Sequence, residues 1–444
     1  MPADVDYLCQ PVRSLSGNLR VPGDKSISHR AVMLAALAEG DTRITGFLPG
    51  EDCLATMHAF AAMGVPIERS GDTELRVTGV GMHGLRAPAA PIDLGNSGTS
   101  MRLLAGLLAP QDFALTLTGD ESLTRRPMRR VTDPLAQMGA NIRTSESGTA
   151  PLELLPPTAP LHGIAFESPV ASAQVKSALL LAGLYAKGRT EVREPQASRD
   201  HTERMLAAFG VTVTAQPGLA AVEGGQSLRA ADVEVPADIS SAAFFLAGAA
   251  MTPGADILLE TVGLNPTRTG VIDILQAMGA DLVVQNERQL GGEPVGDIRV
   301  RGGKLRGAEI AGEVVARAID EFPAIFVAAA CATGETVIRD AAELRVKESD
   351  RIGVMVQALR SLGISAVAAE DGARILGGRI HGGVVDAHGD HRVAMSLAMA
   401  SLRAEQPIRI RDCANVQTSF PGFRELACDA GLEIRAVPGS GERP

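Results

Sequence analysis

Two kinds of predicted helix alternate along the chain, and the first kind is apolar on nearly every face. Such a helix is typical of a buried position. Each segment opens with Asp, Asn or Ser in a position suited to an N-cap. The six segments are GDKSISHRAVMLAALAEG, GNSGTSMRLLAGLLAP, VASAQVKSALLLAGLYAKG, ADISSAAFFLAGAAMTPG, IDEFPAIFVAAACATG and GDHRVAMSLAMASL.

The second kind of helix is amphipathic and ends at a glycine that precedes a β-branched strand. This pattern is typical of a glycine C-cap followed by a strand. It recurs about every seventy to eighty residues, a repeat of the kind that marks similar structural units. The glycines are Gly64, Gly139, Gly210, Gly279, Gly363 and, in a weaker copy, Gly431.

Short strands lie between the two kinds of helix, as in FALTLTG, RTEVRE, TVIRD and IRIRD. Each repeat is therefore predicted to contain a buried helix, a strand, a surface helix and two further strands. A chain of 444 residues is long enough for more than one core. We expect an α/β protein of two domains with three repeats each, one formed by 1–22 and 237–444 and the other by the inserted segment 23–236.

The predicted buried helices begin with more charge than capping requires. Three parallel helices per domain would place their N-termini at one end, where backbone N–H groups and helix dipoles favour anions. Ordinary N-caps would account for Ser, Asn and Asp alone. Charged residues at a buried helix start are unusual without a partner, so we favour a functional role for these positions. The additional polar residues are Lys25, Arg30, Arg102, Gln174, Lys176, Glu321, His391 and Arg392.

Composition narrows the possible ligands and the compartment. The net charge is −10 and only 3% of residues are aromatic, a balance that disfavours nucleic-acid binding. The first residues, MPADVDYLCQPVRS, do not resemble a signal peptide, and no apolar run is long enough to span a membrane. The five cysteines contain no C-x-x-C pair, which predicts neither a disulfide framework nor a zinc site. We expect a cytoplasmic protein.

The stretch VPGDKSISHR looks like a nucleotide-binding phosphate loop but has the wrong spacing. That loop requires Lys directly after the second glycine of G-x-x-x-x-G-K-[ST]. Here Asp24 separates Gly23 from Lys25. We therefore interpret the stretch as a chain turn at Gly23, a cap at Asp24 and a helix start that faces an anion other than a nucleotide.

A set of motifs resembles the EPSP synthase family, the 3-phosphoshikimate 1-carboxyvinyltransferases, from about residue 12 to about residue 425. The motifs occur in the family's order and in register with the repeats, and they are GDKSISHR, LGNSGTSMRLL, RRPM, SAQVKSALLLAGL, RVKESDRI and GDHRVAM. The resemblance implies a two-domain inverted (inside-out) α/β barrel. It has six βαβαββ repeats, three per domain, around parallel buried helices.

The resemblance also implies a reaction. The enolpyruvyl group of phosphoenolpyruvate would move to the 5-hydroxyl of shikimate 3-phosphate with release of phosphate, by addition and elimination through a tetrahedral intermediate. This chemistry needs a proton donor and a proton acceptor. It implies no metal and no cofactor, and its expected partners are these two small molecules. Neither a nucleic acid nor a membrane is expected, and a monomer is the default.

In the inserted domain, the resemblance assigns Lys25, Ser26, Arg30, Ser172, Gln174 and Arg199 to shikimate 3-phosphate. Lys25 and Gln174 would also contact phosphoenolpyruvate, and Lys25 is counted as catalytic. Phosphoenolpyruvate would further contact Gly98 and Arg126, with Asn96 beside Gly98 as a helix cap. The small Gly98 predicts sensitivity to glyphosate, which would occupy the phosphoenolpyruvate pocket.

In the other domain, the resemblance assigns Asp320 as the acceptor of the hydroxyl proton and Glu348 as the proton donor to the methylene carbon. Asp320 and Lys347 would contact shikimate 3-phosphate. Arg351, His391 and Arg392 would hold phosphoenolpyruvate. The spacing from Asp320 to the RVKESDR motif matches the family without a gap.

Other interpretations remain open for several positions. Lys347, Glu348 and Arg351 have the spacing of a solvated helix face. Asp24, Asp238 and Asp390 fit helix caps better than catalytic groups, while Lys176 faces either the site or solvent. The chain departs from many family members at Glu343, Ala173 and the Thr418–Ser419 pair.

Two rival functions also remain. The first is the sister transferase that acts on UDP-N-acetylglucosamine, but that enzyme typically uses a Cys where GDESLTRRPMRR has none. The second is a non-catalytic protein that binds anions or regulates on the same scaffold. Retention of both Asp320 and Glu348 argues against it.

Overall fold

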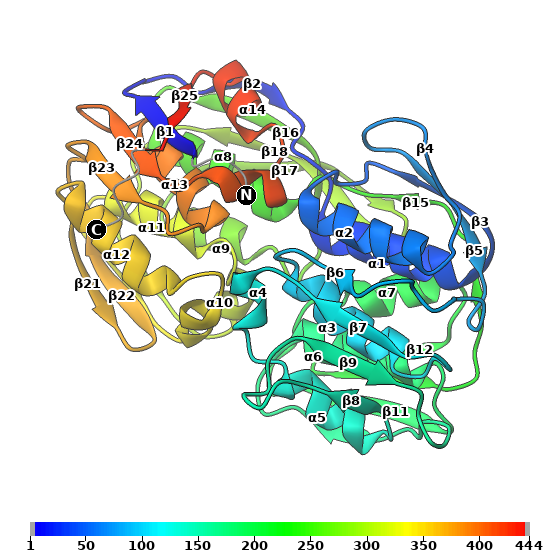
Figure 1. Cartoon of the computed structure of the whole chain (residues 1–444). Helices are drawn as coiled ribbons and strands as arrows, with labels where there is room; N and C mark the ends of the chain where they lie inside the picture. The colour runs from blue at the N-terminus through cyan, green and yellow to red at the C-terminus, as the bar shows by residue number, and fades with distance from the viewer. Residues whose placement is uncertain (1–4, 440–444) are drawn as a thin grey trace. The chain divides into compact units, whose positions relative to one another are not determined.

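Residues 5–439 are described by a computed structural model. Their contacts divide the chain into two units. Unit 1 takes in the described residues of 1–22, 236–289 and 294–444, and unit 2 takes in 23–235 with the short segment 290–293. Each unit combines helices with β-sheets (Figure 1). Each also has a hydrophobic core of its own.

The helices of unit 2 fall into a buried group and an outer group. The buried group supplies much of the core, and α3 packs directly against α6. The buried helices are α1 (Lys25–Leu37), α3 (Gly98–Leu108) and α6 (Ala173–Gly183). The others are α2 (Glu51–Ala62), the short α4 (Glu121–Thr124), α5 (Arg129–Gln137) and α7 (His201–Ala208).

The strands of unit 2 form three separate sheets. The first has the order β14-β3-β5-β4, with β15 also paired to β3: β3 (Ala38–Thr45), β4 (Ile67–Arg69), β5 (Leu75–Val80), β14 (Leu228–Arg229), β15 (Val233–Glu234). The second has the order β6-β7-β9-β8: β6 (Ile92–Asp93), β7 (Leu115–Thr118), β8 (Asn141–Arg143), β9 (Leu152–Leu155). The third has the order β10-β11-β13-β12: β10 (Ala165–Glu167), β11 (Arg189–Arg193), β12 (Val213–Gln216), β13 (Leu219–Glu223).

Unit 1 has the same two groups of helices. Every residue of α8 (Ile239–Met251) and of α11 (Phe322–Ala330) is buried, and both pack with α13 (His391–Ala400). The remaining helices are α9 (Gly270–Ala277), α10 (Glu313–Arg317), α12 (Arg351–Ser361), α14 (Phe423–Asp429) and the 3₁₀ helices η1 (Ala342–Val346) and η2 (Ala414–Thr418).

The strands in the described part of unit 1 also form three sheets. The first has the order β17-β18-β16-β2: β2 (Ser16–Leu19), β16 (Asp256–Gly263), β17 (Asp281–Leu290), β18 (Glu293–Arg301). The second has the order β19-β20-β22-β21: β19 (Glu309–Ile310), β20 (Glu335–Ile338), β21 (Ser365–Ala369), β22 (Gly372–Leu376). The third has the order β23-β24-β1-β25, so the first described strand pairs with the last: β1 (Val5–Gln10), β23 (Gly383–Asp386), β24 (Ile408–Arg411), β25 (Glu433–Pro438).

The predicted glycine stops of the amphipathic helices are confirmed. Each glycine lies two residues after its helix and has a positive φ between 86° and 117°. A residue with a Cβ is strained in that conformation, whereas glycine is not. The glycines are Gly64, Gly139, Gly210, Gly279, Gly363 and Gly431.

Five buried helices have a capping Asp or Ser side chain; the predicted cap is wrong for α3, which was assigned to Asn96, and no side chain caps α11. The side chains of Asp24, Ser97, Ser172, Asp238 and Asp390 accept backbone N–H groups at the starts of α1, α3, α6, α8 and α13. Helix α11 begins after Glu321, whose side chain makes no capping bond. Its carboxylate instead accepts the Ser240 hydroxyl, and Pro323 in the first turn has no N–H to offer.

Gly23 is required by a close backbone approach, which the prediction of a chain turn did not include. Its φ is not positive, so it is not required for a left-handed turn. A Cβ at this position would lie 1.9 Å from the carbonyl oxygen of Gly46. The close approach of two backbone segments therefore requires the glycine. Among residues 5–439, no helix combines the length and apolarity needed to cross a bilayer.

Candidate active site

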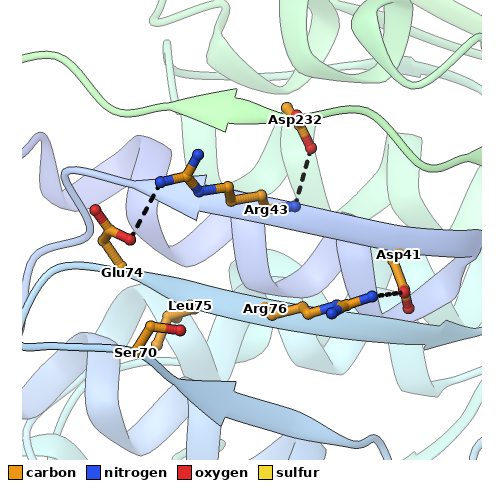
Figure 2. Close-up of a pocket in the computed structure, with 7 residues that line it drawn as sticks. All are labelled: Asp41, Arg43, Ser70, Glu74, Leu75, Arg76 and Asp232. Atoms are coloured by element: carbon orange, nitrogen blue, oxygen red, sulfur yellow. Dashed lines mark hydrogen bonds and ion pairs between the residues drawn. The ribbon is translucent and has the colours of Figure 1, made fainter.

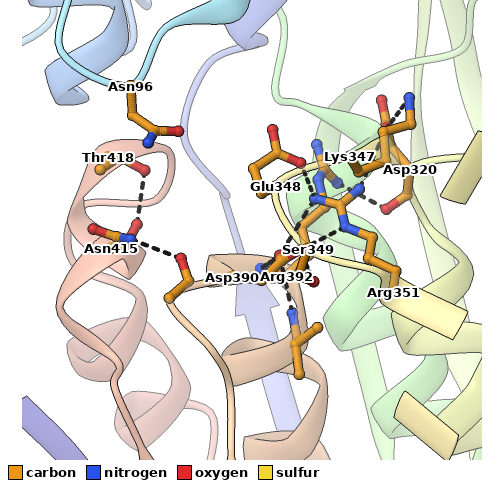
Figure 3. A network of polar contacts seen from close by, with 12 residues as sticks. Asn96, Asp320, Lys347, Glu348, Ser349, Arg351, Asp390, Arg392, Asn415 and Thr418 are labelled. Atoms are coloured by element: carbon orange, nitrogen blue, oxygen red, sulfur yellow. Dashed lines mark hydrogen bonds and ion pairs between the residues drawn. The ribbon is translucent and has the colours of Figure 1, made fainter. Parts of the chain in front are cut away.

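In unit 1, Arg351 lies at the centre of three carboxylates (Figure 3). Its Nε is 2.8 Å from Asp390 Oδ2, its Nη2 is 2.7 Å from Glu348 Oε2, and its Nη1 is 3.5 Å from Asp320 Oδ1. The side chain is 1% exposed. Arg351 begins α12 directly after a non-helical segment, so the alternative interpretation as a solvated helix face is wrong for this residue.

Asp320 is a carboxylate between two cations. Its Oδ1 lies 3.4 Å from Lys347 Nζ and 3.5 Å from Arg351 Nη1. Its side chain retains 14% exposure, so a small molecule can reach it. A positioned carboxylate of this kind can accept a proton from a hydroxyl group.

The charges around Arg351 stabilise one another. Burial alone would lower the pKa of Arg351, but Asp390, Glu348 and Asp320 outweigh it, so its pKa is raised above the ordinary value. Burial would raise the pKa of Asp390, and the Arg351 guanidinium outweighs this effect, so the pKa of Asp390 is lowered. Both groups therefore stay charged at neutral pH, with Arg351 as a fixed cation beside Glu348.

Helix α13 contributes two further predicted residues. Arg392 Nη1 donates to the backbone oxygen of Asp320 at 3.1 Å, and its own N–H donates to Asp390 Oδ1. His391 is the first residue of α13 and is buried. Asp390 therefore has two tasks: it caps α13, as predicted, and it also pairs with Arg351, which the sequence did not reveal.

In unit 2, Lys25 lies at the first position of α1 and its Nζ is 2.5 Å from Asp52 Oδ2. Asp52 is buried in the first turn of α2. Sequence reasoning did not identify Asp52. Acidic residues are common in the first turn of a helix because they interact favourably with the helix dipole. From the sequence, Asp52 could therefore not be distinguished from such a residue, and its pairing with Lys25 was not evident.

The predicted phosphoenolpyruvate contacts Asn96 and Arg126 are joined directly. Arg126 Nη2 donates to Asn96 Oδ1 at 2.6 Å, and Asn96 Nδ2 donates to Asp120 Oδ2 at 2.7 Å. The prediction that Asn96 caps α3 is wrong because the Ser97 hydroxyl accepts the Ser100 N–H. Asn96 is thereby available to orient Arg126.

Gly98 lies at the first position of α3, close to two guanidinium groups. A Cβ there would lie 3.1 Å from Arg126 Nη1 and 3.2 Å from Arg102 Nη1. Arg102 in turn donates to Gln174 Oε1 at 2.5 Å, and Gln174 Nε2 donates to the Thr99 hydroxyl at 3.0 Å. The heads of α3 and α6 therefore share one polar network within unit 2.

Arg30 is buried between three helices. Its Nε donates to Thr202, its Nη2 to Ser177 and its Nη1 to the backbone oxygen of Ser26. Burial lowers the pKa of Arg30 to about 10, partly offset by the charges of Glu203 and Asp24. Its contacts hold the heads of α1, α6 and α7 together.

The other predicted residues of unit 2 lie at chain turns. Ser26 follows Lys25 in the first turn of α1, and Ser172 caps α6 through the Val175 N–H at 3.4 Å. Arg199 is partly exposed in the segment between β11 and α7. Within each unit, the predicted residues thus gather around helix N-termini, as expected for an anion site.

A hollow on the β3–β5–β4 side of unit 2 is separate from these residues (Figure 2). It has a volume of about 360 Å³, and its arginines are paired: Arg43 with Glu74, and Arg76 with Asp41. These pairs are exposed to solvent and none of the predicted site residues lines the hollow. We assign it no role.

Comparisons with known proteins identify the family of this chain. The family model for EPSP synthase (3-phosphoshikimate 1-carboxyvinyltransferase) matches residues 9–426. A 3-phosphoshikimate 1-carboxyvinyltransferase from Alkalilimnicola ehrlichii is 62% identical over 97% of this chain and 96% of its own length. The enzyme of that name from Methylococcus capsulatus is 61% identical over 97% of this chain and 98% of its own length.

A solved structure of EPSP synthase from Acinetobacter baumannii covers 98% of this chain and 100% of its own, with a TM-score of 0.88 and 52% identity. The expected mixed α/β fold of two domains is therefore confirmed. The chain belongs to the EPSP synthase (3-phosphoshikimate 1-carboxyvinyltransferase) family.

Proposed function

We propose that this protein transfers the enolpyruvyl group of phosphoenolpyruvate to the 5-hydroxyl of shikimate 3-phosphate and releases phosphate. Family membership and the relatives' names support the reaction. The observation that carries the residue assignment is Arg351, a buried cation in contact with two carboxylates that are themselves partly exposed, Asp320 and Glu348.

The two carboxylates have separate roles in the proposal. Asp320 accepts the proton of the attacking hydroxyl, a role supported by the cations Lys347 and Arg351 beside its Oδ1. Glu348 donates a proton to the methylene carbon during addition and takes one back during elimination. Lys25 is the third catalytic residue, and its charge stabilises the phosphate that leaves.

The remaining assigned residues bind anionic groups. Arginine forks suit the planar carboxylate of phosphoenolpyruvate, and lysine suits phosphate as a point charge. Shikimate 3-phosphate contacts Lys25, Ser26, Arg30, Ser172, Gln174, Arg199, Asp320 and Lys347. Phosphoenolpyruvate contacts Lys25, Asn96, Gly98, Arg126, Gln174, Arg351, His391 and Arg392.

The test is release of phosphate from phosphoenolpyruvate with and without shikimate 3-phosphate, with UDP-N-acetylglucosamine as the alternative acceptor. We expect release only with the shikimate compound. Release that needs only UDP-N-acetylglucosamine would indicate the sister activity. Absence of release with either acceptor would indicate a non-catalytic protein.

We also propose that each domain is an inside-out barrel of three βαβαββ repeats, with bounds 1–22 with 237–444 and 23–236. Three sheets and three buried helices in the described part of each unit support the repeat number. The division of the chain into two units with separate internal contacts supports the bounds. A direct test is expression of 23–236 alone, which should give a cooperatively folded fragment.

Three further properties belong to the proposal. The enzyme is a monomer, which sedimentation can test. It is cytoplasmic, in agreement with its free cysteines, three of which are buried. It is inhibited by glyphosate in competition with phosphoenolpyruvate, because Gly98 leaves the space near Arg126 open.

A further inference from the structure

Lys176 is the most deeply buried lysine of unit 2, and it has no role in the proposed reaction. It lies on α6, four residues after the cap Ser172, and its side chain is 5% exposed. Its Nζ lies 2.8 Å from Glu203 Oε1, 3.1 Å from Glu194 Oε2 and 3.4 Å from the backbone oxygen of Ser198. An ammonium group has three donors, and here three protein oxygens surround it.

Glu194 connects this lysine to two chain segments. Its Oε1 accepts the backbone N–H of Ser172 at 2.7 Å. The hydroxyl of Ser198 lies 2.8 and 2.7 Å from the two oxygens of the same carboxylate. Glu194 follows β11, which is paired on both sides within its sheet, so the carboxylate projects from a fixed support.

The two segments held by Glu194 carry proposed ligands of shikimate 3-phosphate. Ser172 is one of them, and Arg199 follows Ser198 directly. A third, Arg30, lies near the other carboxylate: it donates to Thr202, the neighbour of Glu203. Burial lowers the pKa of Arg30, and the charge of Glu203 offsets part of that lowering. The buried cluster of Lys176, Glu194 and Glu203 therefore contacts or adjoins the segments that carry Ser172, Arg199 and Arg30. In the proposed function these three residues bind the same phosphorylated ring.

Charge explains why a lysine occupies this position. Two buried carboxylates would oppose binding of a phosphate group at the nearby arginines. Burial would lower the pKa of Lys176, but Glu203 and Glu194 outweigh it and the pKa is raised. The lysine therefore remains charged, offsets one carboxylate charge and has its donors directed at protein oxygens rather than at a ligand.

We infer that Lys176 and Glu194 form a positioning pair for shikimate 3-phosphate: they fix Ser172 and the segment that carries Arg199 without contacting the substrate. This inference rests on the proposed function and on the assignment of Ser172 and Arg199. It distinguishes a residue that orders the binding surface from one that binds.

The test compares Lys176→Met with Lys187→Met. Lys187 is exposed and lies in the same unit, so both variants lose one positive charge. For Lys176→Met, we expect the KM for shikimate 3-phosphate to rise about 10–100-fold, because small displacements of positioning groups have effects of this order. The KM for phosphoenolpyruvate should stay within about twofold, since uniform loss of packing would change both constants. Lys187→Met should match the unaltered protein.

A second variant covers the case in which Lys176→Met does not fold. Ser198→Ala removes the hydroxyl at Glu194 but leaves no buried charge unpaired. Thermal unfolding establishes that a variant is folded, and calorimetry measures its affinity for shikimate 3-phosphate and for phosphoenolpyruvate. A selective loss of that affinity in whichever variant folds supports the inference. An unchanged affinity, or an equal loss for both substrates, overturns it.

Failure of the proposed function gives a different result. If the unaltered protein neither binds shikimate 3-phosphate nor releases phosphate in its presence, the function itself is wrong. If the unaltered protein does both and the variants match it, the function stands and the positioning role is wrong.

Discussion

Arg351 and Asp390 form an ion pair in which both side chains are almost entirely removed from solvent, with Nε and Oδ2 2.8 Å apart. Asp390 also caps α13, so one carboxylate links the start of α12 to the start of α13. Removal of one partner from a buried pair leaves the other charge uncompensated. The position of Arg351 therefore depends on Asp390, which has no assigned role in catalysis or substrate binding.

Asp390→Asn tests this dependence. We expect a loss of about 3–5 kcal/mol in the free energy of unfolding, the typical cost of breaking a buried pair. The matched control is Asp350→Asn, since Asp350 caps α12 and pairs with the partly exposed Arg345. That change should cost no more than about 1 kcal/mol from its ion pair. Equal losses in the two variants, measured by urea denaturation, would contradict the proposed importance of burial.

Asp320→Asn and Glu348→Gln test the proton transfers. Each change keeps the shape of the side chain and removes its ability to exchange a proton. We expect kcat to fall about 100- to 10,000-fold in each variant, the usual contribution of general acid–base catalysis. Glu343→Gln is the control because Glu343 lies 3.9 Å from Lys347 Nζ yet has no assigned catalytic role. A variant of Asp320 or Glu348 with near-normal kcat would remove that residue from the mechanism.

Gly98→Ala tests the space beside Arg126. The added methyl group would lie 3.1 Å from Arg126 Nη1 and 3.2 Å from Arg102 Nη1, so both flexible ends must move. Crowding of this kind costs about 1–3 kcal/mol, and we expect it to weaken the binding of both phosphoenolpyruvate and glyphosate. Gly71→Ala is the control, because a Cβ at Gly71 meets no atom within 4 Å. The measurement is KM for phosphoenolpyruvate and inhibition by glyphosate; equal values in the two variants would place the inhibitor elsewhere.

His29 predicts a pH dependence of stability. It is fully buried on α1, and its Nδ1 lies 2.7 Å from the Thr56 hydroxyl. Burial, together with the charges of Lys25 and Arg30, lowers its pKa well below 6.5, with Asp24 acting in the opposite direction. The unfolded chain therefore takes up a proton that the folded protein does not.

The sign of the effect follows from this difference. As the pH falls below about 6.5, the free energy of unfolding should decrease by about 1.4 kcal/mol per pH unit from this group alone. In His29→Asn that contribution should disappear, while His58→Asn, a change at an exposed position, should retain it. The slopes are measured by denaturation at several pH values between about 5 and 7, because a histidine in the unfolded chain changes its charge in this range. Equal slopes in the unaltered protein, His29→Asn and His58→Asn would contradict the prediction. They would show that His29 takes up its proton over the same pH range in the folded protein as in the unfolded chain.

Local sequence features predicted much of the fold. A glycine after each amphipathic helix, such as Gly139, was identifiable because a positive φ is favourable only for that residue. The apolar segment that became α8 was identifiable as buried because it has no polar face. For Asp24 and Asp390, capping depends on neighbours within three residues, so the sequence contains the information.

Pairings between distant residues could not be predicted from local features. Asp52 and Lys25 are 27 residues apart, and Arg351 and Asp390 are 39 apart. Asn96 and Ser97 both favour an N-cap position, so the sequence could not decide between them. The cap of α3 was assigned to Asn96, which is wrong. In the structure the Asn96 side chain contacts Arg126 and Asp120 instead, and both lie more than twenty residues away along the chain.

The sequence by itself determined the repeat pattern, the helix ends and the kinds of charged residue at the helix starts, because each depends on spacing along the chain. The tertiary structure decided which of those charges meet. Lys176 illustrates the difference: its helix and neighbours were evident, but its direction depended on Glu194 and Glu203, which β11 and α7 bring to it. Long-range packing selects among side-chain partners that local sequence leaves equivalent.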